Sequence, residues 1–112
     1  AFNFLISSYN LSILEEMNKI DLHHPYLGLI QGNILENKDN YYNFIKKNNI
    51  TAIIVDINFL SDEETQKQLL EYRKNKIHTY AFTVNHPKMI NAIPNIENLL
   101  DGIITDDPAK FI

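Results

Sequence analysis

Carboxylates that follow apolar runs are the first residues in this sequence that could do chemistry. Asp56 follows a run rich in Ile and Val, and Asp106 and Asp107 follow another run near the end of the chain. If these runs were parallel strands of one sheet, the three carboxylates could gather at one end and bind a divalent cation through oxygen. Capping of the next turn explains a single carboxylate at a strand end equally well. Both roles stay open at this point.

An adjacent pair of histidines and one aromatic ring are further candidates. His23 and His24 do not face one another on a helix or strand, and Pro25 follows them, so we expect a helix exit there and no metal site. Phe82 lies in a strand-like run, where its ring either packs in the core, which is the default, or contacts a ligand. The three glycines are too scattered for a phosphate-binding loop, and there is no Ser-x-Gly nucleophile elbow.

The size and charge of the chain exclude several classes of protein. Its 112 residues suit one domain. A formal charge of −4 with a single arginine leaves no basic face, so we expect no nucleic-acid partner. No apolar run approaches the roughly 18 residues of a membrane helix, and no signal peptide is visible, so the location in the cell stays open. The chain starts without Met at an expected strand, so we expect it to belong to a longer protein.

Five short apolar runs alternate with longer polar stretches of helical periodicity. The runs cover residues 2–7, 26–30, 51–57, 78–84 and 101–106. Continuous apolar runs are typical of strands covered on both faces, and their alternation with helices predicts a parallel α/β sheet. Ligands bind at the carboxyl ends of such strands. The candidate rim therefore consists of Ser7, Ser8, Tyr9, Asn10, Gln31, Asn33, Asp56, Asn58, Thr83, Asn85, His86, Thr105, Asp106 and Asp107.

Capping signals predict where the helices begin and end. Ser61 and Glu64 have the spacing of a capping box, and Asn75 falls where the same helix needs a left-handed C-terminal residue. The other expected boundaries are an N-cap at Asn10 or Ser12, an N-cap at Asp39, Pro87 in a first turn, and Pro94 as an interruption.

Two segments resemble the glycerophosphodiester phosphodiesterase family. Residues 79–108, TYAFTVNHPKMINAIPNIENLLDGIITDDP, resemble its C-terminal aromatic-Thr-Val-Asn strand, short helix and Asp-Gly-Ile-Ile-Thr-Asp-x-Pro ending. Residues 4–17, FLISSYNLSILEEM, resemble its strand that ends in Ser-Phe-Asp or Ser-Phe-Asn and leads into a helix. The order and spacing of the motifs agree along nearly the whole chain.

The resemblance implies a fold and an activity. The family is a (β/α)₈ TIM barrel that hydrolyses glycerophosphodiesters to glycerol 3-phosphate and an alcohol, usually with a divalent metal such as Ca or Mg. The five expected strands match the last five of that barrel, so residues 1–112 would be its C-terminal portion, an incomplete barrel. The family's catalytic motifs are His-Arg-Gly, Glu-x-Asp, His-Asp and Glu-x-Lys, and we expect none of them in these 112 residues. We therefore expect no catalytic residue, no bound metal and no phosphodiesterase activity in these residues alone.

The resemblance also assigns roles to individual residues. Phe82 occupies the position where the family often has Trp, as an aromatic wall beside the glycerol moiety. Ser8 and Tyr9 match the family's Ser-Phe pair at the rim and are expected in the same pocket wall. Asn85 and Asp106 match motif positions at strand ends, where we expect a structural role first.

An incomplete barrel has two open edges and a face without its opposite wall. Apolar residues expected to be exposed for this reason are Phe2, Phe4, Ile54, Ala81 and Ile104. We expect the chain to self-associate or to pair with the missing half, and the intact protein to bind a small glycerophosphodiester. Membrane attachment of the parent protein is left open.

Two other classes compete with the enzyme. A receiver-like α/β domain would show the same alternation of apolar runs and polar helical stretches. It needs an acidic cluster after its first strand, however, where this sequence has Ser-Ser-Tyr-Asn. A non-catalytic scaffold or ligand-binding domain derived from the family can be distinguished from an enzyme only by the residues upstream of these.

Overall fold

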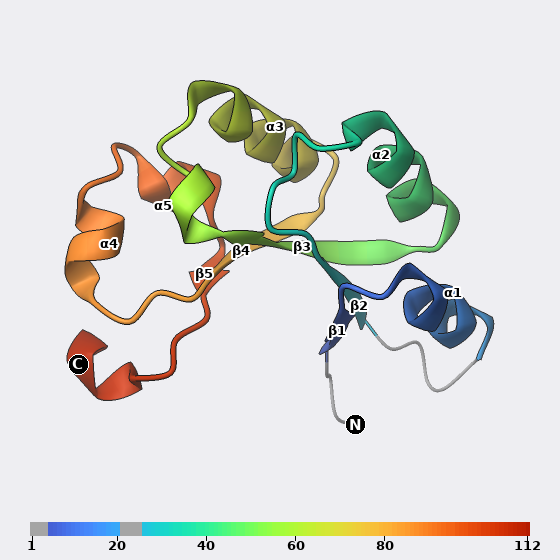
Figure 1. The fold of residues 1–112 in the computed structure, drawn as a ribbon, viewed down its shortest axis with the longest axis horizontal. Coiled ribbons are helices and arrows are strands. Elements are labelled where there is room, and N and C mark those ends of the chain that lie inside the picture. Colours follow the sequence, from blue (N-terminus) through green and yellow to red (C-terminus); the bar gives the residue numbers. More distant parts are fainter. Residues whose placement is uncertain (1–4, 21–25) are drawn as a thin grey trace.

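The computed structural model describes residues 5–20 and 26–112, and its strands form one open parallel sheet (Figure 1). The strand order is β1-β2-β3-β4-β5, with every neighbouring pair parallel. The elements in chain order are β1 (Leu5–Ser8), α1 (Leu11–Lys19), β2 (Tyr26–Ile30), α2 (Lys38–Lys47), β3 (Ile50–Asp56), η1 (Ile57–Phe59), α3 (Glu63–Lys74), β4 (His78–Phe82), α4 (Pro87–Asn91), α5 (Ile96–Leu99), β5 (Gly102–Ile103) and η2 (Pro108–Phe111). The predicted α/β alternation and parallel sheet are confirmed.

The last two strands are shorter than the apolar runs predicted. β4 ends at Phe82 and β5 has two residues, but the backbone pairing continues, because the Val84 amide donates to the Ile104 carbonyl at 2.9 Å. The peptide bond between Phe82 and Thr83 is cis. No helix in residues 5–20 and 26–112 meets the length and hydropathy that a membrane crossing requires.

Helices cover one face of the sheet and form the main core with it (Figure 1). On β3, Ile53 and Val55 belong to this core and are fully buried, whereas their neighbours point to the opposite face because side chains alternate along a strand. Tyr72 of α3 is also fully buried, and this burial raises the pKa of its phenol. The other α-helix residues buried here are Leu14, Ile45, Leu69 and Leu99.

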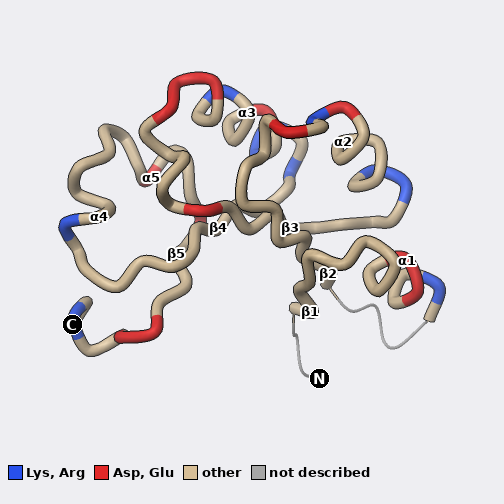
Figure 2. The backbone as a smooth tube through the Cα atoms, viewed as in Figure 1, with Lys and Arg blue, Asp and Glu red and all other residues tan. Residues whose placement is uncertain are grey.

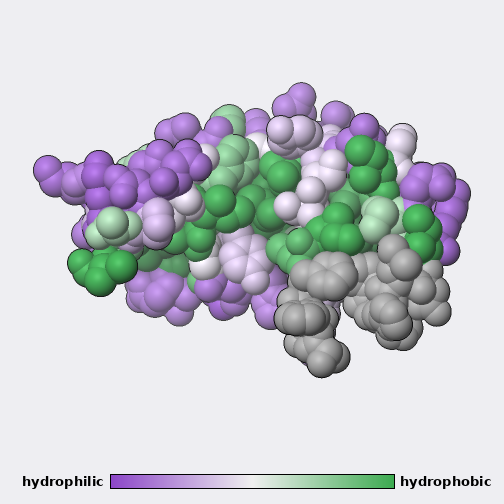
Figure 3. All heavy atoms as spheres, turned by 90° about the horizontal axis from the view of Figure 1, so that it is seen from below, coloured by the Kyte–Doolittle hydropathy of each residue, from purple (hydrophilic) through white to green (hydrophobic). Residues whose placement is uncertain are grey.

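The opposite face of the sheet is apolar and partly open. Figure 3 views the molecule from below and shows a hydrophobic band across it. Exposed apolar residues here include Leu5, beside Gly28 on β2, and Ile104, which is 43 % exposed. The expected exposure of Ile104 is therefore confirmed, whereas Phe2 and Phe4 lie outside the described residues.

The expected exposure of Ile54 and Ala81 was wrong. Ile54 is 1 % exposed because it lies in a central strand, with Ile30 of β2 and Tyr80 of β4 in register on its two sides. Ala81 is fully buried because it points to the other face and packs in the helix-covered core. Exposure on the open face is thus concentrated toward the edges of the sheet.

Three predicted helix boundaries are confirmed. Asn10 caps α1, its side-chain oxygen accepting from the Ile13 amide at 3.2 Å. Pro87 follows the N-cap of α4 and stands in its first turn. Pro94 separates α4 from α5, because proline cannot donate the amide that a continuous helix needs.

Three other boundaries were misplaced. The N-cap of α3 is Asp62 and not Ser61: the Asp62 carboxylate accepts from the Thr65 amide at 3.0 Å. Acidic residues gather where this helix begins, as Figure 2 shows, and the helix dipole favours them there. The N-cap of α2 is Asn37, with φ of 52°, and the predicted cap Asp39 lies in the first turn.

The left-handed residue after α3 is Lys76, one position later than the predicted Asn75. The Ile77 amide donates to the Tyr72 carbonyl and the Lys76 amide to the Arg73 carbonyl, both at 3.0 Å. This pair of bonds defines a Schellman motif, whose left-handed position is one residue beyond the C-cap.

Asp101 joins three elements at the amino ends of the last two strands. Its carboxylate accepts from the Thr79 amide at 2.8 Å and from Nη2 of Arg73 at 3.0 Å, and its own amide donates to the Thr79 carbonyl at 2.7 Å. Since Arg73 lies on α3 and Thr79 on β4, this carboxylate fixes the start of β5 against both.

We expect Asp101→Ala to lower the free energy of unfolding by about 1–3 kcal/mol, because it leaves the Thr79 amide without its side-chain acceptor and removes one of the two acceptors of the Arg73 guanidinium. Urea denaturation followed by circular dichroism measures the change. Glu16→Ala is the control, since Glu16 pairs with Lys19 on the surface with 70 % of its side chain exposed and should change stability by less than about 1 kcal/mol. Equal losses of unfolding free energy in the two variants would show that the hydrogen bonds of Asp101 do not hold β5 against α3 and β4.

Candidate functional site

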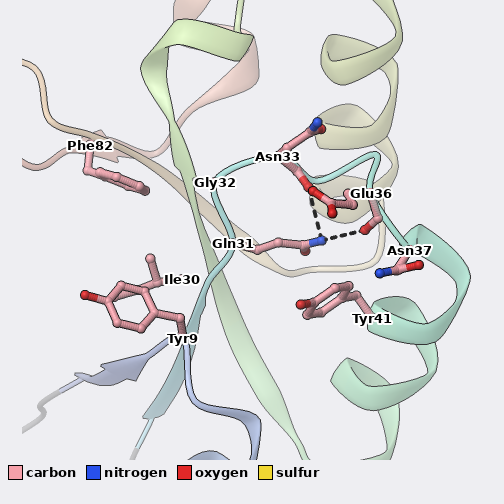
Figure 4. Close-up of a pocket in the computed structure, with 9 residues that line it drawn as sticks. All are labelled: Tyr9, Ile30, Gln31, Gly32, Asn33, Glu36, Asn37, Tyr41 and Phe82. Atoms are coloured by element: carbon pink, nitrogen blue, oxygen red, sulfur yellow. Dashed lines mark hydrogen bonds between the residues drawn. The ribbon is translucent and has the colours of Figure 1, made fainter.

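A pocket of about 270 Å³ lies at the carboxyl ends of the strands (Figure 4). It is where the loops after β1 and β2, the end of β4 and the start of α2 meet. The residues that line it are Tyr9, Ile30, Gln31, Gly32, Asn33, Glu36, Asn37, Tyr41 and Phe82. This is the edge of the sheet at which a ligand was expected.

Gln31 forms the centre of the pocket wall and holds the turn after β2. Its backbone amide donates to the Ile54 carbonyl at 2.9 Å, which extends the pairing with β3 by one residue. Its side-chain Nε2 donates to the carbonyls of Asn33 at 3.3 Å and Glu36 at 3.1 Å, the two bonds drawn in Figure 4. Gln31 is 6 % exposed, and within the described part of the chain its Oε1 has no hydrogen-bond partner.

Two of the three predicted wall residues line this pocket. Phe82 ends β4 and Tyr9 directly follows β1, and the two lie on the same side of the pocket in Figure 4. Ser8 does not line it: its Oγ accepts from the Asn10 amide at 3.0 Å and so holds the turn into α1. A contact of Phe82 and Tyr9 with substrate stays a prediction.

Asn85 and Asp106 lie outside the pocket and join two loops. Asn85 Oδ1 accepts from the Asp106 amide at 2.9 Å and from the Thr105 hydroxyl at 3.1 Å. The Thr105 oxygen in turn accepts from the Asp107 amide at 3.0 Å. These bonds tie the loop after β4 to the loop after β5.

The three carboxylates considered as a cation site do not form one. Asp56 Oδ1 accepts from the Asn58 amide at 2.9 Å and caps η1, and Asp107 lies 3.7 Å from the Lys110 ammonium. In residues 5–20 and 26–112, no three acidic, histidine or cysteine side chains are grouped so as to hold a metal. The pair His23 and His24 lies outside these ranges.

Sequence reasoning missed the part of the pocket that comes from the turn before α2 and from the helix itself. Glu36, Asn37 and Tyr41 line it, but none follows a strand directly. A signal was available, because helices that follow parallel strands begin at the ligand-binding edge. One catalytic motif of the family, the pattern Glu-x-Lys, does occur once in the sequence, at Glu36-Asn37-Lys38. It lies in this turn rather than on a strand.

Comparison with known proteins agrees with this architecture. The structure resembles the crystal structure of glycerophosphodiester phosphodiesterase from Thermotoga maritima, with a TM-score of 0.76 and 22 % sequence identity. The match covers 96 % of this chain and 45 % of that one, so the chain spans less than half the length of that protein. Comparison with curated proteins gave no match. The model of the glycerophosphoryl diester phosphodiesterase family matches residues 2–110, so the resemblance expected from the motifs is confirmed, and the chain belongs to this family.

Proposed function

We propose that this chain is the C-terminal part of the barrel of a glycerophosphodiester phosphodiesterase, which hydrolyses its substrate to glycerol 3-phosphate and an alcohol. The observation that carries the proposal is the pocket walled by Phe82 and Tyr9 at the carboxyl edge of the sheet, in a chain of this family. Barrel enzymes bind substrate at that edge.

Phe82 and Tyr9 bind the glycerol moiety through the faces of their rings. Both rings present apolar surface to carbon-bound hydrogens, and the Tyr9 hydroxyl adds a hydrogen-bonding group at the rim. Phe82 has no indole N–H, so its contribution is apolar contact. Ser8 acts indirectly, because its bond to the Asn10 amide fixes the turn that carries Tyr9.

The catalytic groups come from a segment outside these 112 residues. The family typically uses a divalent metal, but the described residues gather no set of ligands that fits one. We therefore assign no metal ligand in this part of the chain, and the general acid and base also belong to that segment.

The open face of the sheet provides the surface on which such a segment packs. β1 and β5 each lack a neighbour on one side within the described residues, and Leu5, Tyr26 and Ile104 are 41–49 % exposed. Unpaired edges and exposed apolar surface favour association. The missing strands or a second copy of the chain would bury this surface.

Sedimentation velocity of the purified 112-residue chain should show a dimer or larger species, because an isolated chain has only another copy with which to cover this face. Ile104→Lys should shift the distribution toward monomer, whereas Ile13→Lys, an equally exposed residue on α1, should not. A strictly monomeric chain with no dye-accessible apolar surface would contradict the association.

The chain by itself should not hydrolyse glycerophosphodiesters. The protein encoded by the complete gene should carry His-Arg-Gly and Glu-x-Asp upstream and should hydrolyse them, with activity lost on chelation of divalent metal. Release of glycerol 3-phosphate measures both. Metal-dependent turnover by the 112-residue chain would overturn the division of roles, and upstream residues without these motifs would favour a non-catalytic scaffold.

In the complete protein, Phe82→Ala should lower kcat/KM roughly 5- to 100-fold, the equivalent of about 1–3 kcal/mol of lost apolar contact. Phe82→Trp should retain most of the activity, since it keeps an aromatic wall. Phe59→Ala is the matched control, because this exposed ring is not part of the pocket lining. Equal activity of the Ala and Trp variants at position 82 would show that the aromatic ring of Phe82 does not contact the substrate.

A further inference from the structure

The side of the pocket away from Phe82 offers a buried acceptor. Both hydrogen bonds that the structure gives the Gln31 amide use its Nε2, so the orientation of the amide is set and Oε1 remains as an acceptor. Within the described part of the chain this oxygen has no partner. Buried acceptors in proteins are nearly always paired, and an unpaired one calls for a specific explanation. A ligand that donates a hydrogen bond supplies one here, because Gln31 lines the pocket.

The charge of this part of the pocket favours a cation. Glu36 lines the pocket and is exposed, and no Lys, Arg or His is among the described lining residues. The ring of Tyr41 lies on this side of the pocket, and aromatic faces attract cations. Lys38 follows Asn37 in the chain but is not part of the lining.

We infer that this side of the pocket binds a primary ammonium group on the alcohol half of the diester, an inference that rests on the proposed function. The ammonium donates one hydrogen bond to Gln31 Oε1 and pairs with the Glu36 carboxylate, with the Tyr41 ring beside it. A quaternary ammonium satisfies the charge but has no N–H to donate to Oε1. A neutral polyol donates a hydrogen bond but gains nothing from Glu36.

Access requires a local rearrangement. Gln31 Oε1 is itself covered, so an entering ammonium must displace a neighbouring side chain. The rim residues Glu36 and Asn37 are exposed and can move without opening the core.

The test compares three diesters that share glycerol and phosphate and differ in the alcohol. Glycerophosphoethanolamine, glycerophosphocholine and glycerophosphoglycerol are titrated into the 15N-labelled 112-residue chain, with dissociation constants taken from amide shifts. We expect the first to bind at least 5-fold more tightly than the other two, with shifts at Gln31, Asn33 and Tyr41. Equal affinities for all three would overturn the inference and leave the proposed function standing.

Two variants test separately the hydrogen-bond acceptor Gln31 Oε1 and the negative charge of Glu36. Glu36→Gln should reduce the preference for both cationic diesters over glycerophosphoglycerol, whereas Glu63→Gln, an exposed residue on α3 that is not part of the lining, should not. Gln31→Met should make glycerophosphoethanolamine and glycerophosphocholine bind equally. If Gln31→Met does not fold, Glu36→Gln alone decides, and an unchanged preference overturns the inference. Failure of all three diesters to bind the complete protein would overturn the proposed function as well.

Discussion

Parallel pairing of the five strands is the constraint on which the rest of the structure depends. Every connection returns the chain to the same end of the sheet, so residues distant in sequence, such as Tyr9, Gln31 and Phe82, meet at one edge. The pairing continues past β2, where the Gln31 amide donates to Ile54 and the Asp56 amide donates to the Gly32 carbonyl. These backbone hydrogen bonds hold the turn that forms the centre of the pocket, so the pairing of the strands fixes the geometry of the site.

The two faces of the sheet are completed to different extents. Helices bury one face, and the result is a continuous core from Leu14 to Leu100. The other face is buried only where a strand has neighbours on both sides, as at Ile54, and is open at Leu5 and Ile104. In a closed barrel the strand opposite would cover such residues. The structure is therefore that of a barrel segment whose outer packing is complete and whose inner packing is not.

Helix boundaries illustrate how far local sequence signals reach. Asn10 was one of two predicted caps of α1, and its side chain is the one that accepts from an amide three residues ahead. Ser61 and Asp62 stand side by side as capable caps, and the difference between them is smaller than local reasoning resolves. The same holds after α3, where the position of Lys76 depends on which amide reaches the Tyr72 carbonyl. Such one-residue choices follow from the packing of the whole helix.

The sequence by itself determined the alternation of strands and helices, the family and two aromatic residues of the pocket, because periodicity and motifs are local properties. Only the tertiary structure decided that Ser8 turns away to hold a loop, that Ile54 is covered, and that Glu36 and Tyr41 join the pocket. A sequence pattern indicates which face of an element a side chain occupies. It does not indicate what lies across the gap from that face, since this depends on how separate elements pack in space.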